Sequence, residues 1–276
     1  MHSKSDRIPS NKRILLTYPK LAELFRKFFL QRMICMKRLA ALCCILTVLL
    51  RMPGLHTAAI GYGQGKECDA QNCPLGASTF QAQYDSLGAY ALSSDRAQIL
   101  LTFDQGYENG YTASILDTLK EKHVRALFFL TGDYAKSEPE LVQRMIAEGH
   151  MLGNHGMTHA ALPSLTDEEM TGEIMRLHQY MLDRYDYEMQ YFRPPCGEYD
   201  ERALAKIRSL GYQTVFWSAA YVDWNTEAQP DPAASLQKLS GMAHGGAIYL
   251  LHSVSSTNAE ILGELIDSLR AQGYQV

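Results

Sequence analysis

The sequence predicts an α/β protein, a distorted (β/α) barrel of about seven units whose last strand is short or truncated. From residue 96 onward, short apolar runs rich in β-branched and aromatic residues alternate with amphipathic stretches, which is typical of βα units around a parallel sheet. A content of 46% apolar and 20% charged residues suits a chain that forms a core. Five of six predicted strands are followed by a titratable or charged residue, which favours a barrel with one chemical rim.

The first 59 residues differ from the rest in charge. They carry 11 Lys/Arg against 2 Asp/Glu, whereas residues 60–276 carry 15 Lys/Arg against 28 Asp/Glu. Binding to phosphate relies on clustered Lys/Arg. The acidic body therefore argues against nucleic acid or an anionic membrane as the main partner.

Residues 36–59 have the pattern of a secretory signal peptide. A basic start at 36–38 precedes twelve uncharged residues, 39–50, and small residues at 57–59 suit a cleavage site. Twelve apolar residues are too few to span a bilayer comfortably. We expect export across the cytoplasmic membrane, to the cell wall or the medium, with an uncleaved anchor as the alternative. Residues 1–35 fit no signal pattern and are interpreted as a start-site extension.

Residues 60–95 are rich in Gly, Gln, Ser and Ala with little periodicity, and we interpret them as a connecting arm before the domain 96–276. Boundary signals in the domain include Thr166 before an acidic first turn and a glycine just past several helix ends. A further strand begins at Tyr274. The predicted strands are 98–103, 126–131, 150–153, 191–193, 213–218 and 247–251, and the predicted helices are 112–122, 138–148, 167–185, 200–210, 232–243 and 259–272.

Asp104 stands at the mouth of the apolar strand 98–103. Partial burial there can tune the pKa of a carboxylate toward that of a useful general base, and a helix N-cap is the alternative role. His252 closes the strand 247–251 in the same way and suits a general acid. A histidine bonded to a backbone carbonyl is the alternative for His252.

His155 and His159 lie four residues apart, just past a strand. Two imidazoles turned to one side suit a divalent metal, most readily Zn²⁺. With Asp104 and His252 they make up the groups required for metal-assisted hydrolysis of an amide or ester. The loop 106–110 lacks the spacing of a phosphate-binding loop, which disfavours a nucleotide cofactor.

Three cysteines follow the predicted signal peptide, Cys68, Cys73 and Cys196. An odd number does not suit a disulfide scaffold. A bridge between Cys68 and Cys73 and two free thiols are both compatible with the spacing. Cys196 has no acid–base partner adjacent in sequence, so we interpret it as a groove residue rather than a nucleophile.

Five segments occur in a fixed order along residues 96–276: 102–106 (TFDQG), 155–159 (HGMTH), 193–197 (RPPCG), 223–224 (DW) and 250–252 (LLH). They resemble the five motifs of the polysaccharide deacetylases of carbohydrate esterase family 4, the NodB-homology domain. Five ordered motifs over that length are far more specific than any one of them.

This resemblance implies a role for each matching residue. Asp104 would be the base, Arg193 would orient it, and His252 would protonate the leaving amine. His155 and His159 would hold the metal, and a backbone N–H near Cys196 would help hold the oxyanion. The implied substrate-binding residues are Trp224, Cys196, Gly197, Asp223, Tyr199 and Asn109.

Two positions depart from the family pattern. Gln105 stands where a second aspartate completes the metal site, and a neutral amide is a weaker ligand, so lower metal affinity is expected. Ala220 stands where an aspartate tunes the acid histidine, so His252 is expected to be less basic than in relatives. Glu108 and Asn109, on the loop after the base, could replace the missing ligand, contact substrate or shape a turn.

Residues 104–112, 211–218 and 247–255 are similar to the muramic-δ-lactam-forming de-N-acetylases of spore-forming bacteria. That resemblance implies a monomer acting on N-acetylmuramic acid of peptidoglycan strands, as a step towards muramic δ-lactam in spore cortex. Arg193 or a Lys/Arg on the rim could pair with the lactyl carboxylate. The alternatives are a deacetylase of N-acetylglucosamine or another polysaccharide, and a glycan-binding barrel that has lost catalysis.

Overall fold

The computed structural model describes residues 59–276, which belong to one compact unit, Thr57–Val276. The predicted start-site extension and nearly all of the predicted signal peptide lie outside the described residues. Among the described helices, none combines the length and the apolar character that crossing a membrane requires.

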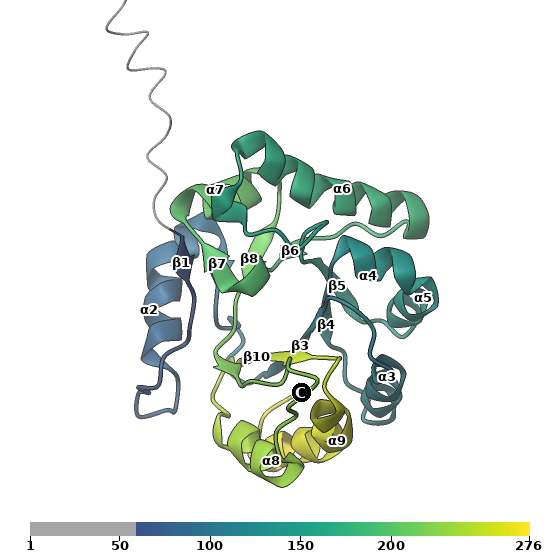
Figure 1. The fold of residues 1–276 in the computed structure, drawn as a ribbon. Coiled ribbons are helices and arrows are strands. Elements are labelled where there is room, and N and C mark those ends of the chain that lie inside the picture. The colour runs from purple at the N-terminus through teal and green to yellow at the C-terminus, as the bar shows by residue number, and fades with distance from the viewer. Residues whose placement is uncertain (1–58) are drawn as a thin grey trace, which may run out of the picture. The chain divides into compact units, whose positions relative to one another are not determined.

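An eight-stranded parallel sheet curls into a half-barrel with helices outside it (Figure 1). The strand order is β2-β8-β6-β5-β4-β3-β10-β9, and it does not return on itself, so the barrel stays open. The strands are β2 (Ala89–Tyr90), β3 (Leu100–Gln105), β4 (Leu127–Leu130), β5 (Met151–Asn154), β6 (Tyr191–Phe192), β8 (Gln213–Val215), β9 (Ala219–Ala220) and β10 (Ile248–His252). The predicted α/β class and distorted barrel are confirmed.

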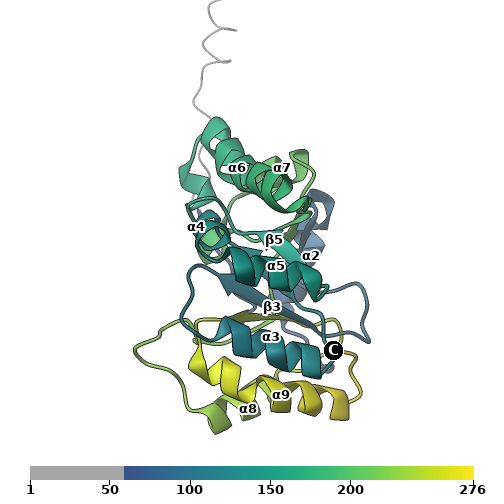
Figure 2. The same ribbon diagram turned by 90° about the vertical axis from the view of Figure 1, so that its right-hand side faces the viewer.

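Helices cover the outer side of the sheet. In the turned view, α3 lies above α8 and α9, with α5 and α6 farther along the molecule (Figure 2). The helices are α2 (Leu75–Tyr84), α3 (Thr112–Glu121), α4 (Gly132–Ser137), α5 (Pro139–Ala147), α6 (Asp167–Tyr185), α7 (Glu201–Ser209), α8 (Pro232–Gly241) and α9 (Ser256–Ala271). Helix α6 begins with a capping box, in which Thr166 and Glu169 satisfy each other's backbone N–H groups.

Residues 60–95, predicted as a connecting arm, hold helix α2 and the edge strand β2 of the main sheet, neither of which was predicted. Helix α2 buries only Ala77, Phe80 and Tyr84, and its other residues carry no amphipathic pattern. Strand β2 has two residues, too few for a period. The predicted strand from Tyr274 is short: it forms a single parallel bridge between Gln98 and Gln275.

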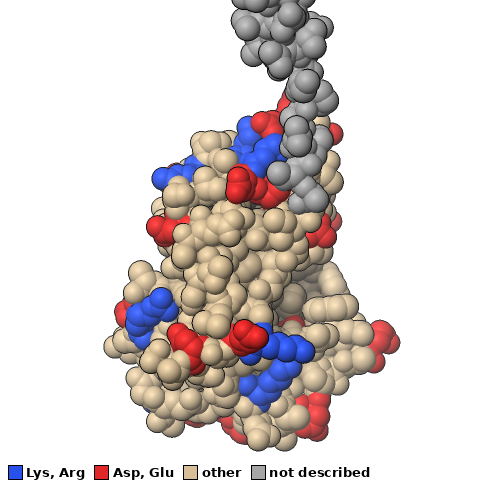
Figure 3. Space-filling model, turned by 90° about the vertical axis from the view of Figure 1, so that its left-hand side faces the viewer, with Lys and Arg blue, Asp and Glu red and all other residues tan. Residues whose placement is uncertain are grey.

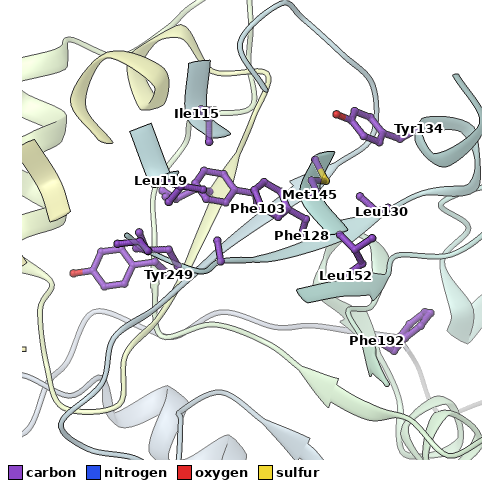
Figure 4. Packing of buried hydrophobic residues seen from close by; sticks show 14 of the residues in the cluster. Phe103, Ile115, Leu119, Phe128, Leu130, Tyr134, Met145, Leu152, Phe192 and Tyr249 are labelled. Atoms are coloured by element: carbon purple, nitrogen blue, oxygen red, sulfur yellow. The ribbon is translucent and has the colours of Figure 1, made fainter. Parts of the chain in front are cut away.

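Side chains of β3 and β4 alternate between the two faces of the sheet. Phe103 and Phe128 point to the helices, with their rings stacked at 5.1 Å between centroids (Figure 4). Leu127 and Phe129 belong to a smaller cluster, on the opposite face. Because successive residues of a strand point to opposite faces, Asp104 shares the concave inner face rather than the helix-covered one.

Candidate active site

A pocket of about 870 Å³ opens at the carboxyl ends of the strands. Seven residues singled out from the sequence line it: Asp104, His155, His159, Cys196, Gly197, Trp224 and His252. Asp104 and His252 are register partners on the adjacent parallel strands β3 and β10. The curled sheet therefore gathers the predicted acid–base groups at one rim, as strand ends in a barrel should.

Asp104 is a buried carboxylate with one oxygen tied down. Arg193 Nη1 lies 2.7 Å from Asp104 Oδ1, and Asp104 Oδ2 lies 3.5 Å from His155 Nε2. Burial raises the pKa of Asp104, but the charges of Arg193 and the nearby histidines outweigh it, so the pKa is lowered from its ordinary value. Oδ2 is left as an ionised oxygen on the pocket side.

Arg193 is completely buried, and its guanidinium bonds to strand β3 and to the end of β8. Its guanidinium donates to the Thr102 hydroxyl at 2.8 Å, besides Asp104, and to the carbonyls of Val215 and Phe216 at 3.1 Å each. It also lies 4.2 Å from the Phe129 ring centroid. The expectation that Arg193 could pair with a substrate carboxylate is therefore wrong, because it has no exposed surface.

A tight loop after β5 brings the two predicted metal ligands together. Asn154 Oδ1 accepts from the Gly156 N–H at 2.9 Å, and positive φ angles at Gly156 (86°) and His159 (60°) turn the chain back. The Nε2 atoms of His155 and His159 lie 3.2 Å apart. Two imidazole nitrogens this close share a proton or a cation.

His155 is prepared to use its Nε2 lone pair. Its Nδ1 lies 2.8 Å from the carbonyl of Arg193, and since a carbonyl only accepts, Nδ1 carries the proton. Burial is the main cause that lowers the pKa of His155 to about 4, and burial also lowers the pKa of His159. Both rings are neutral near pH 7, the form in which imidazole binds metal.

The donor set fits a metal at the two histidines, but not at Gln105. Gln105 is completely buried, is absent from the pocket lining, and its amide nitrogen donates to the Ser253 hydroxyl at 2.5 Å. Its Oε1 has no hydrogen-bond partner among the described residues. Within residues 59–276, no group of three or more His, Cys, Asp or Glu side chains is arranged to hold a metal ion.

His252 is paired with Asp223. His252 Nδ1 lies 2.8 Å from Asp223 Oδ1, and Asp223 Oδ2 accepts from the His252 N–H and the Asn258 amide. Burial lowers the pKa of His252, but the hydrogen bond and charge of Asp223 outweigh it, and the pKa is raised above 6.5. Ala220 lies in β9, and Asp223 supplies the carboxylate that contacts the imidazole.

Three predicted substrate-binding residues do not line the pocket. Asp223 has no exposed surface and serves His252. Tyr199 is buried against Phe80, with ring centroids 5.3 Å apart. Asn109 donates its amide to the Val254 carbonyl at 2.9 Å, so it joins two rim loops instead.

Glu108 shapes the loop that follows the base. Its carboxylate accepts from the Gly110 N–H at 2.6 Å and from the Thr112 hydroxyl at 2.5 Å. Of the three roles considered for Glu108, the turn role is the one that these bonds support. All three described cysteines are free, so Cys68 and Cys73 are not bridged.

Sequence reasoning missed several lining residues. Tyr107 and Asp133 follow β3 and β4, and Trp217 follows β8; the rule that strand ends form the rim could have found them. It also missed Glu173 on α6, which is 3% exposed. The Glu173 carboxylate accepts from the N–H and hydroxyl of Thr158 at 2.6 and 3.1 Å, which fixes the loop that carries His159.

Comparisons with known proteins identify relatives of the chain. A family model described as polysaccharide deacetylase matches residues 92–215. The chain is 42% identical over 194 residues to the peptidoglycan-N-acetylmuramic acid deacetylase PdaA of Bacillus subtilis, covering 70% of this chain and 73% of the relative. It is 31% identical over 191 residues to a peptidoglycan-N-acetylglucosamine deacetylase of Bacillus cereus, covering 67% and 68%.

A solved structure has the same fold. The structure of Bacillus subtilis PdaA, a family 4 carbohydrate esterase, superimposes with a TM-score of 0.74 at 38% sequence identity. The match covers 79% of this chain and 94% of that one.

Proposed function

The chain belongs to the polysaccharide deacetylase family, and on that premise we propose that it removes the acetyl group from N-acetylmuramic acid of peptidoglycan. One observation carries the proposal. Asp104 and His252 face one pocket, and their surroundings shift the two pKa values in opposite directions. An ionised carboxylate beside a protonated imidazole is the pair that hydrolysis of an amide requires.

The reaction needs two proton transfers. Asp104 Oδ2 accepts a proton from water while the water oxygen bonds to the acetamide carbon. His252 then donates its Nε2 proton to the sugar nitrogen as the C–N bond breaks, which releases acetate and a free amine. Because Nδ1 of His252 is bonded to Asp223, Nε2 is the nitrogen that is free for this step.

We propose that His155 and His159 hold a divalent metal, with Zn²⁺ as the first choice for imidazole ligands. When bound, such an ion polarises the acetamide oxygen and activates water. The neutral rings and the hydrogen bond from His155 Nδ1 to the Arg193 carbonyl support this role. A backbone N–H near Cys196, which lines the same pocket, is proposed to help hold the oxyanion.

The muramic acid substrate is supported by the relative PdaA, whose name gives that sugar. Deacetylation would leave an amine beside the lactyl carboxyl of the same sugar, and their condensation with loss of water gives the δ-lactam. We propose this as the role of the chain in spore cortex. It requires export, for which residues 36–59 are the proposed signal.

N-acetylglucosamine is a second candidate substrate, because the described pocket lining contains Asp133 but no Lys or Arg. A muramic acid with a free lactyl carboxylate brings a negative charge that glucosamine lacks. A glycan-binding barrel without catalysis is less well supported, since Asp104, His155, His159 and His252 all retain the required contacts.

Mass spectrometry of digested peptidoglycan tests these alternatives. Glycan strands with and without stem peptides are incubated with the purified protein and with Asp104→Asn. Loss of acetyl from muramic acid by the wild type alone supports the proposal. Loss of acetyl from N-acetylglucosamine supports the second candidate substrate. If neither sugar loses acetyl, the proposed deacetylase activity is overturned.

A further inference from the structure

Residues 60–65, the first part of the segment 60–95, lie against the wall of the pocket, and only these six residues are meant by the arm below. The arm begins with β1 (Ile60–Gly61), which pairs antiparallel with β7 (Glu198–Tyr199). Next along the arm, the Tyr62 N–H donates to the Gly197 carbonyl at 2.9 Å. Gly197 lines the pocket, so the arm is hydrogen-bonded directly to the backbone of the pocket wall.

Two side chains of the arm hold Trp217. Gln64 Oε1 accepts from the indole Nε1–H at 3.0 Å, and the Tyr62 hydroxyl donates to the Trp217 carbonyl. The rings of Tyr62 and Trp217 meet edge to face, with centroids 5.1 Å apart. Trp217 itself is 9% exposed and lines the pocket. The arm therefore supports a pocket residue from behind.

The indole of Trp217 is held on its other side by Gly197. A Cβ atom at Gly197 would lie 2.7 Å from the Trp217 ring, and Gly197 has a φ of +67° that favours glycine. Helix α2 fixes the arm in turn, because a Cβ at Gly76 would lie 2.5 Å from the Gln64 carbonyl oxygen. The indole thus has contacts that define its position on both sides.

The Trp217 segment also touches the catalytic ion pair. The Arg193 guanidinium lies 5.8 Å from the Trp217 ring centroid and donates to the carbonyl of the preceding residue, Phe216. Figure 3 shows the face on which α2 lies, where a wide area without charged side chains separates small groups of both signs. Aromatic packing and hydrogen bonds, rather than ion pairs, are the contacts described here between the arm and the domain.

We infer that the arm is part of the active site, and that Tyr62 and Gln64 are positioning residues that fix Trp217 in its place in the pocket wall. The turnover readout of this inference rests on the proposed deacetylase function. Neither side chain contacts Asp104 or His252 among the described bonds. Their loss should therefore weaken glycan binding more than it slows the chemical step.

Three variants of the full chain test this inference through steady-state acetate release. Gln64→Leu removes the acceptor for the indole N–H, Gln64→Glu keeps an acceptor oxygen, and Gln71→Leu changes an exposed glutamine outside the arm as the control. For Gln64→Leu we expect KM to rise about threefold to tenfold, the equivalent of one hydrogen bond, with kcat changed by less than about twofold. Gln64→Glu and the control should keep the wild-type KM.

A fluorescence measurement separates this inference from the proposed function. The chain has two tryptophans, so Trp224→Phe leaves Trp217 as the only tryptophan, whose emission is followed by selective excitation. In that background, Gln64→Leu should red-shift the emission and increase quenching by iodide, while Gln64→Glu should not. If wild type releases no acetate, the deacetylase function fails and the emission still decides the inference. Unchanged emission and KM in Gln64→Leu would overturn it, as would equal changes in Gln71→Leu.

Discussion

His252 and Asp223 form a hydrogen-bonded pair across 29 positions of the chain, with Nδ1 and Oδ1 2.8 Å apart. Asp223 follows the last strand before α8, and His252 ends β10. The pair leaves Nε2 as the only ring nitrogen available to the pocket. It also sets the pH range in which the imidazole keeps its proton.

Asp223→Asn should lower the pKa of His252 and move the alkaline limb of the kcat/KM profile to lower pH. The charge of Asp223 raises that pKa above 6.5 against the effect of burial. Above pH 7 the rate should fall at least about tenfold, within the range of acid–base catalysis. Asp231→Asn, at the α8 N-cap, is the control and should leave both limbs in place; an unmoved alkaline limb in Asp223→Asn would exclude this role.

The same pair makes stability depend on pH. Because the folded pKa of His252 is raised, its contribution to the free energy of unfolding is fully present below the ordinary value of 6.5. It is lost as pH rises through the folded pKa. Between about pH 5 and 8, the range in which histidine titrates, urea unfolding should show a decline in the free energy of unfolding of wild type that His252→Gln lacks.

Arg193→Met should destabilise the fold by about 3–5 kcal/mol, since it leaves the Asp104 carboxylate buried without its partner. The double variant Arg193→Met with Asp104→Asn removes both charges and should recover part of this loss. Chemical denaturation gives the free energy of unfolding of both single variants and the double variant. If the losses of the two single variants simply add up in the double variant, Arg193 and Asp104 are not energetically coupled.

In wild type, the lowered pKa of Asp104 contributes stability that is present at pH values above the ordinary pKa of aspartate. This stability is lost as the pH falls through the pKa of Asp104 in the folded protein.

His159→Ala should reduce Zn²⁺ affinity at least about tenfold, because the two Nε2 atoms converge on one point. The control is His123→Ala, an exposed histidine outside the pocket. Calorimetry and metal analysis after dialysis give the stoichiometry. One equivalent that remains in His159→Ala, or none in wild type, would rule out the two-histidine site.

Trp224→Ala should raise KM about tenfold with little change in melting temperature. Trp224 is 58% exposed and lines the pocket, so it offers an aromatic face to sugar while packing little into the core. Val222→Ala, two residues earlier and 62% exposed, is the control because Val222 does not line the pocket. If both variants raise KM equally, the cause is a change in loop conformation and not the loss of the Trp224 ring.

Asp133→Asn should raise kcat/KM by about twofold to fivefold for muramic acid with a free lactyl carboxylate, because an exposed like charge costs up to about 1 kcal/mol. The same variant should leave N-acetylglucosamine and amidated lactyl substrates unchanged. Paired assays on matched oligosaccharides measure the ratio. An equal gain on all three would show that the charge of Asp133 does not discriminate the lactyl group.

The regular part of the fold was predictable from periodicity and boundary signals. The long helix 167–185 was predicted with the bounds that α6 has, because a capping box and an amphipathic stripe specify it. The six main strands were placed within one to three residues of their observed bounds. Helix α2 and strand β2 were missed, since ten residues with three buried side chains and a strand of two residues carry almost no period.

The site was predictable where strand ends supply the residues, and not where tertiary contacts redirect them. Asp104 and His252 are register partners near the carboxyl ends of adjacent strands, so their meeting follows from topology. Asp223 was predicted to bind substrate because its position in a motif does not show that the loop brings its carboxylate to His252. Gln105 was predicted as a metal ligand although it is the last residue of β3. Successive side chains of a strand point to opposite faces, so Gln105 points away from the face that carries Asp104. Glu173 lies far along the chain from the loop that it holds.

Because Arg193 is buried beside Asp104, the stability of the fold depends on the same carboxylate as the proposed chemistry. Its guanidinium bonds β3, the residues after β6 and the end of β8 into one structure, and Asp104 is its carboxylate partner. A descendant that replaced the base alone would keep an uncompensated cation in its interior. A change at Asp104 is therefore expected to lower stability as well as the proposed activity, and a second change at Arg193 should recover part of the lost stability.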